Sequence, residues 1–171
     1  MMALLFAALA MMASDKPEPT AEESAYELVN ATKVATACTT HEKGPFGSVM
    51  PYALDAEGRP LIFISTLAVH TKNIDKNPKA SLFVTKPSEE VKLDSPRVTL
   101  IGEFKKVPEK ELKGVKEAYF KKYPDAKIYE MFHDFSFYRL EITDIYYVGG
   151  FGPKPIDWLD VDKYKKAAKA K

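Results

Sequence analysis

One stretch decides how the chain folds: 62-IFISTLAVHTKNIDKNPKASLFV-84, which predicts a strand, a short helix and a second strand. Its first residues are apolar and β-branched, as is typical of a strand. Ser65 and Thr66 then offer hydroxyls that can cap a helix over residues 68–76. Asn77 and Pro78 end that helix, because proline restricts the residue before it and has no N–H to donate. The second strand follows over residues 80–85.

The junction between the first strand and the helix is a candidate anion site. The first N–H groups of a helix have no partner within the helix, and they carry partial positive charge. His70 and Lys72 lie in the first turns, so a phosphate monoester is the natural occupant. The alternative is a capped connecting helix with a solvated basic face, and this stretch alone leaves both open.

Length and composition limit the class of protein. The 171 residues suggest a single domain with a hydrophobic core. Because 25 basic residues face 24 acidic ones, the charge gives no support for a nucleic-acid binder. Cys38 is the only cysteine, which excludes an internal disulfide and a cysteine-based zinc site. The three histidines lack metal-ligand spacing, so no metal site is predicted.

The first 13 residues are almost wholly apolar and too short to span a bilayer as a helix. They resemble a signal-peptide core with small residues for cleavage, although no Lys or Arg precedes them. The alternative is an apolar extension that packs on the domain or on a partner. We therefore expect a signal-like segment and linker over residues 1–20, and one domain over residues 21–171 without a membrane span. Export to a secreted or periplasmic location depends on that signal, and the chain is otherwise cytoplasmic. Asn30 begins a glycosylation sequon.

The remaining pattern predicts further strands and short helices. Strands are expected over residues 34–40, 46–54, 97–107 and 135–148, and helices over residues 21–31 and 108–122. Two more helices are expected after the capping residues Asp125 and Asp160. Tight turns join consecutive strands, and the tally is about six strands. This pattern favours a mainly β, antiparallel barrel with flanking helices over a doubly wound sheet.

The strand 44-GPFGSVMPY-52 has an unusual composition for a structural strand. Gly47 lets a ligand approach the backbone, Ser48 offers a donor, and Tyr52 offers a ring and a hydroxyl. A flat heteroaromatic ligand could lie along it; the alternative is a bulged strand that packs its aromatic side chains in the core. Arg97, which opens a later strand, could bind phosphate, stack on a ring, or remain solvated.

No self-sufficient catalytic motif is present in the sequence. It contains no GxSxG, P-loop, GxGxxG or HExxH pattern. His133 and Asp134 are adjacent, so they would not face one another on a helix as an acid–base pair. No catalytic residue is assigned, and any enzymatic chemistry is expected to come from a cofactor.

Several segments, taken in order, resemble the pyridoxamine 5′-phosphate oxidase-like FMN-binding split barrels. They are residues 34–36, 44–52, 65–74, 77–82, 96–102 and 138–152. The sequence is most similar to the branch that contains the CREG proteins and the haem-utilisation protein HugZ, over residues 21–152. The resemblance implies a six-stranded antiparallel split β-barrel, a homodimer, and FMN at the subunit interface.

The resemblance also implies a set of cofactor-binding residues. The strand along the flavin would contribute Gly47, Ser48, Val49 and Tyr52, and the phosphate would be surrounded by Ser65, Thr66, His70, Thr71 and Lys72, with Arg97 near the ring or the phosphate. The chain departs from the pyridoxamine-phosphate oxidases, because it has fewer basic residues there and no match to their pyridoxal-phosphate site. A HugZ-type C-terminal haem-binding extension is not evident.

The main interpretation is a dimeric FMN-binding split barrel, with flavin-dependent oxidation or reduction of an unidentified small molecule as its candidate activity. One alternative is a secreted, non-catalytic interaction protein like the CREG proteins, which share the ending 151-FGPK-154 and are not expected to use FMN. The second alternative is a haem-binding or haem-degrading protein. The sequence does not decide among the three.

Overall fold

The computed structural model describes residues 17–86 and 94–170. The predicted signal-like segment lies outside this range, except for residues 17–20. Within the described residues, no helix has the length and apolar character needed to cross a bilayer.

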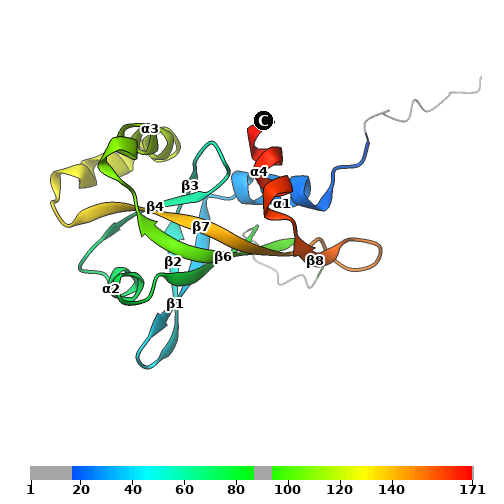
Figure 1. The fold of residues 1–171 in the computed structure, drawn as a ribbon, viewed down its shortest axis with the longest axis horizontal. Helices are drawn as coiled ribbons and strands as arrows, with labels where there is room; N and C mark the ends of the chain where they lie inside the picture. Colours follow the sequence, from blue (N-terminus) through cyan, green and yellow to red (C-terminus); the bar gives the residue numbers. More distant parts are fainter. Residues whose placement is uncertain (1–16, 87–93, 171) are drawn as a thin grey trace, which may run out of the picture.

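The described strands form one antiparallel sheet that curls into a half-barrel (Figure 1). Their order is β2-β1-β5-β6-β7-β4-β3, and β8 pairs with β7. The bounds are β1 Val34–His41, β2 Gly44–Pro51, β3 Ala53–Leu54, β4 Pro60–Ser65, β5 Lys79–Thr85, β6 Arg97–Lys106, β7 Phe135–Val148 and β8 Ile156–Leu159. The predicted split-barrel class is confirmed, with eight strands in place of about six.

The two additional strands have local causes. The strand predicted over residues 46–54 is interrupted at Tyr52, which leaves β3 as a separate strand paired with β4. The other is β8, which follows the glycine-rich segment after β7 and turns back against its end. Sequence pattern did not indicate β8, because its four residues show no burial alternation.

Strand β7 is the centre of the sheet. Its 14 residues pair with β6 along one edge. Along the other edge its first five residues pair with β4, and its last four pair with β8. Strands β4 and β8 therefore both pair with the same edge of β7, one at each end of the strand.

The core lies on the concave side of the curled sheet. Ile62, Leu82, Leu100 and Leu140 come from four neighbouring strands and are fully buried there. Along β5 and β6 buried residues alternate with partly exposed ones, as expected for a sheet with one packed face.

Two helices from the ends of the chain close one side of the barrel (Figure 1). The first, α1 (Ala21–Ala31), begins with a capping box between Thr20 and Glu23. The second, α4 (Val161–Lys169), is capped by Asp160, which accepts hydrogen bonds from two backbone N–H groups. The rings of Tyr26 and Tyr164 meet edge to face at 5.8 Å between the two helices. Both helices were predicted, the second from its cap at Asp160, and both predictions are confirmed.

Three further helices flank the sheet, and the first of them adds Ile74 to the barrel core. The short helix α2 (Val69–Lys76) packs beside β1, and α3 (Leu112–Lys122) follows a 3-10 turn, η1 (Glu109–Glu111). The segment after α3 is a 3-10 helix, η2 (Pro124–Met131). A second apolar cluster under α3 joins Val115 and Tyr119 to Phe63 and Phe137, which lie on β4 and β7.

A pair of glycine variants tests how closely β6 and β7 approach. Gly102 lies at an irregularity in the β6–β7 register, and a Cβ atom there would lie 2.0 Å from the backbone oxygen of Glu141. We expect Gly102→Ala to destabilise the fold by about 4 kcal/mol or more, since the backbone itself must move. Urea unfolding followed by circular dichroism measures this change.

The matched control is Gly114→Ala. Gly114 lies in α3 with nothing within 4 Å of an added Cβ. Alanine should stabilise the helix there by about 0.5–1 kcal/mol. A Gly102→Ala protein as stable as the parent would contradict the close packing of β6 on β7.

Candidate functional site

The start of α2, where a phosphate site was predicted, already uses most of its hydroxyl groups internally. The Ser65 hydroxyl donates to the Asp134 carboxylate and accepts a hydrogen bond from the Leu67 N–H at 3.0 Å. The Thr71 hydroxyl donates to the Ser65 carbonyl oxygen at 2.6 Å. The N-cap of α2 is Ala68, which makes no side-chain cap. The expectation that Ser65 or Thr66 caps this helix is therefore wrong. The Ser65 hydroxyl forms its hydrogen bonds with Asp134 and Leu67, which lie outside the helix.

A carboxylate and two apolar side chains give this helix start its chemical character. Asp134 lies beside Ser65, and its carbonyl oxygen accepts a hydrogen bond from the Thr66 N–H at 2.8 Å. Leu67 and Val69 are 74% and 42% exposed. A carboxylate repels a phosphate, and exposed apolar side chains gain from covering by an apolar ligand. The site therefore suits an apolar ligand better than a phosphate alone.

His70 is the group at this site that suits metal chemistry. Its side chain is half-buried on α2, and burial lowers its pKa below the usual value for histidine. The imidazole is therefore neutral at neutral pH, which is the form that ligates metals. Lys72, two residues further along α2, is exposed and supplies positive charge. Thr66 is exposed as well.

The predicted ligand-binding strand β2 lies at the edge of the sheet, near a cavity of about 400 Å³. Along this strand Gly47 and Val49 are exposed and Ser48 is partly exposed. The cavity extends from the start of β2 across β1 and β5 to Ile101 of β6, and Lys79 lines it. The edge position also agrees with Pro51, which cannot donate to a neighbouring strand.

One buried hydrogen bond connects this cavity to α2. The Asn73 side-chain amide donates to the hydroxyl of Thr39, a residue that lines the cavity, at 3.0 Å. Both side chains are buried. The bond joins α2 to β1 beside this cavity, but none of the predicted residues of α2 or β2 lines the cavity itself.

Two of the predicted residues do not join this region. Tyr52 is fully buried, its hydroxyl donates to the Val29 carbonyl oxygen, and Lys122 lies 4.8 Å above its ring. Its position matches the alternative in which this aromatic side chain packs in the core. Arg97 pairs with Thr85 at the far end of β5, about 20 Å along the strand from Lys79, where β5 begins.

Other side chains that can bind a metal lie apart from one another. Within residues 17–86 and 94–170 no group of three His, Cys, Asp or Glu side chains could hold a metal ion. Cys38 is exposed on β1. The Nδ1 atom of His41 accepts a hydrogen bond from the Lys43 N–H, so the proton of the neutral ring lies on Nε2. His133 is exposed in the turn before β7.

The comparison with known proteins points to one family and to relatives named for haem. The family model for the CREG β-barrel matches residues 16–166. The chloroplastic non-canonical heme oxygenase HOZ of Arabidopsis thaliana is 39% identical over 117 residues, which are 68% of this chain and 36% of HOZ. The chain thus spans about a third of the length of that relative.

The comparison with solved structures also finds heme proteins of similar fold. The heme-binding protein from Mycobacterium smegmatis superposes with a TM-score of 0.79 at 31% identity, over 88% of this chain and 62% of that one. HutZ, the heme storage protein from Vibrio cholerae, superposes with a TM-score of 0.63 over 72% of this chain and 92% of its own. HutZ is 21% identical, so it supports the fold alone.

The hydrogen bond between Asn73 and Thr39 makes a testable contribution to the site. Replacing Asn73 with alanine leaves the buried Thr39 hydroxyl without one partner and removes the side-chain hydrogen bond between α2 and β1. We expect Asn73→Ala to lower the free energy of unfolding by about 1–3 kcal/mol. Lys76→Ala, at an exposed position of the same helix, should change it little. Urea unfolding measures both, and equal midpoints would contradict an anchoring role for Asn73.

Proposed function

This chain belongs to the CREG β-barrel family, as its sequence resemblance predicted, and we propose that it is a haem-binding split barrel. The observation that carries the proposal is the 39% identity with HOZ. The heme-binding protein from Mycobacterium smegmatis, at 31% identity, supports the same ligand. Haem therefore has more support than FMN, the cofactor of our main interpretation from sequence.

The residues at the start of α2 fit haem. A haem iron needs an axial donor, its macrocycle needs apolar surface, and its propionates need cations. His70 would supply the neutral imidazole, and the exposed Leu67 and Val69 would cover part of the macrocycle. Lys72 and Lys79 would meet the propionates. Bound there, haem would supply a redox-active iron, while the chain would orient it and exclude water.

The same residues give weaker support to the FMN interpretation. The hydroxyls of Ser65 and Thr71 are used within the protein, and Asp134 adds negative charge where the phosphate would lie. The donors left for a phosphate are Thr66, the N–H of the neutral His70 ring, Lys72 and the backbone. This geometry thus supports a flavin phosphate less well than it supports haem.

Oxidative degradation of haem is a second candidate function, and its support is the name of HOZ, a heme oxygenase. Degradation would need bound haem, so it depends on the first proposal. It differs from storage or transport in one respect, because it consumes the haem when a reductant and oxygen are supplied.

We also propose that the protein is a homodimer that associates through the outer face of its sheet. A row of side chains crosses six paired strands on this face: Val49, Thr36, Phe83, Thr99, Tyr146 and Trp158. Val49 and Trp158 are 74% and 59% exposed, and the rings of Tyr146 and Trp158 are 5.1 Å apart. Four of these six side chains are apolar or aromatic, and we call the set the apolar row; an exposed patch of this kind marks an interaction surface.

Two histidine variants test the haem proposal. Ferric haem added to the purified protein should give a Soret band that saturates at one haem per chain. His70→Ala should weaken haem binding by at least about tenfold, since even outer-shell partners of a bound metal are worth that much. His133→Ala, which removes an exposed imidazole, should bind like the parent. Because burial lowers the pKa of His70, acid should release haem only below the usual pKa of histidine, about 6.5.

Three outcomes would contradict the proposal. They are a parent protein that gives no Soret band, equal loss of binding in both variants, and a purified or reconstituted protein that shows flavin absorption alone. Ascorbate added to the haem complex in air then separates the two functions. Progressive loss of the Soret band supports degradation, and a stable band supports binding alone.

The dimer is tested by a charge placed on the outer face. Phe83 lies at the centre of the apolar row, so Phe83→Asp should convert the dimer to a monomer, because a carboxylate cannot be buried there without a partner. The control is Ile128→Asp at an exposed apolar position of η2, outside the row. Light scattering at micromolar concentration measures the mass, and a monomeric parent would contradict the proposal.

A further inference from the structure

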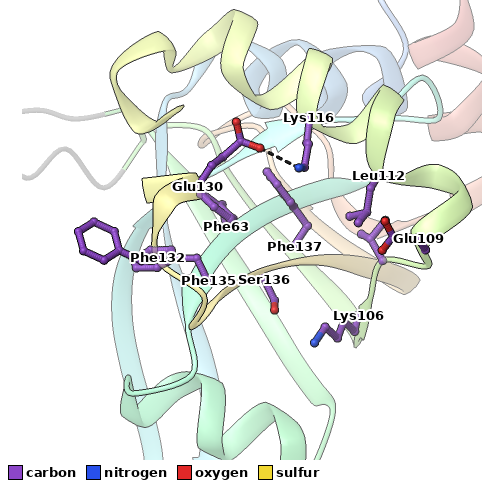
Figure 2. Close-up of a pocket in the computed structure, with 11 residues that line it drawn as sticks. Phe63, Lys106, Glu109, Leu112, Lys116, Glu130, Phe132, Phe135, Ser136 and Phe137 are labelled. Carbon is purple, nitrogen blue, oxygen red and sulfur yellow. Dashed lines mark ion pairs between the residues drawn. The ribbon is translucent and has the colours of Figure 1, made fainter. Parts of the chain in front are cut away.

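A second cavity lies on the opposite side of β4 and β7 from the barrel core. It holds about 270 Å³ between these strands, α3 and the end of η2 (Figure 2). None of the residues that line it belongs to α2 or β2, so it is distinct from the proposed haem site. Nothing in the proposed function uses it.

Aromatic rings form the walls of this cavity. Phe63 and Phe137 stack almost in parallel, with ring centroids 4.3 Å apart and planes at 15°. Phe135 lies 5.1 Å from Phe63, and Phe132 is 49% exposed at the edge of the cavity. Figure 2 shows these rings gathered along one side, with Leu112 of α3 opposite. Flat apolar walls favour a planar apolar ligand, since offset and edge-on ring contacts add to its burial.

The charged residues at the rim determine which polar group a ligand can carry. On one side Lys116 and Glu130 form an ion pair at 2.8 Å, so their charges compensate each other. On the other side Lys106 is exposed and makes no ion pair within the part of the chain that is described. Glu109 also lines the cavity, but its carboxylate cannot attract an anion. Lys106 is therefore the cation that an anionic group would meet.

The size of the cavity limits the ligand to one or two rings. An apolar cavity of about 150 Å³ is known to hold benzene, and drug-sized ligands occupy about 300–1,000 Å³. A volume of about 270 Å³ is too small for haem and sufficient for a fused pair of rings. We propose that this cavity binds a small planar aromatic carboxylate, with its rings against Phe63 and Phe137 and its carboxylate at Lys106.

Titration calorimetry with 2-naphthoate tests this proposal on the full chain. Lys106→Ala should weaken naphthoate binding by about fivefold, the upper end of what an exposed ion pair contributes. It should leave binding of the neutral analogue 2-naphthylmethanol unchanged. The matched control is Lys105→Ala, the neighbouring exposed lysine, which pairs with Glu103 and does not line the cavity. It should bind both compounds like the parent.

A second variant fills the cavity. Leu112→Trp adds a large side chain across from the phenylalanines and should abolish binding of both compounds. Three results would overturn the proposal: no naphthoate binding by the parent at millimolar concentration, undiminished binding by a folded Leu112→Trp protein, or equal weakening by the two lysine variants. Displacement of naphthoate by one equivalent of haem would also overturn it, because the two ligands would then share a site. Should Leu112→Trp fail to fold, the comparison of Lys106 with Lys105 decides.

Discussion

Every other part of this structure depends on the backbone hydrogen bonding of β7. One 14-residue strand satisfies β6 on one edge and both β4 and β8 on the other. Buried backbone N–H and C=O groups need such hydrogen-bond partners. A shift of any of these strands would therefore leave backbone groups of its neighbours unpaired. The side chains of β7 also separate two apolar regions, because Leu140 points into the barrel core and Phe137 points into the cluster under α3.

The end of the β4–β7 pairing determines the chemistry of the proposed haem site. The ladder finishes where Ser65 lies opposite Phe135, and the next residue back along the β7 side is Asp134. Its carboxylate and carbonyl oxygen therefore bind the chain just before α2 begins. Consequently α2 starts beside a negative charge and behind exposed apolar side chains. The negative charge weakens the attraction that a helix N-terminus has for an anion. It does not weaken the binding of an apolar metal complex through a neutral histidine ligand.

Helices and strands that depend on residues close in the sequence were predicted. Contacts between strand ends that are far apart in the sequence were not. The caps at Thr20 and Asp160 place α1 and α4 correctly, because a cap is a local signal. The strands β5 and β6 were predicted from their local apolar, β-branched composition for the same reason. By contrast, the bond between Ser65 and Asp134 spans 69 residues, and only the pairing of β4 with β7 reveals it. Arg97 shows the same limit, since its type suggested a ligand contact and its register places it far from α2.

The two cavities lie at different places on the outward face of the sheet, one over β1, β2 and β5 and the other between β4, β7 and α3. The cavity near β2 lies beside the apolar row, so in the dimer that we propose a second copy would change its surroundings. The cavity under α3 is built from residues of a single chain and closed on one side by the ion pair of Lys116 and Glu130. Phe63 and Phe137 lie back to back with the core residues of β4 and β7, which are held in place by the same ladder. The rings that line this cavity and the residues just before α2 are therefore positioned by one ladder, which ends where Ser65 lies opposite Phe135.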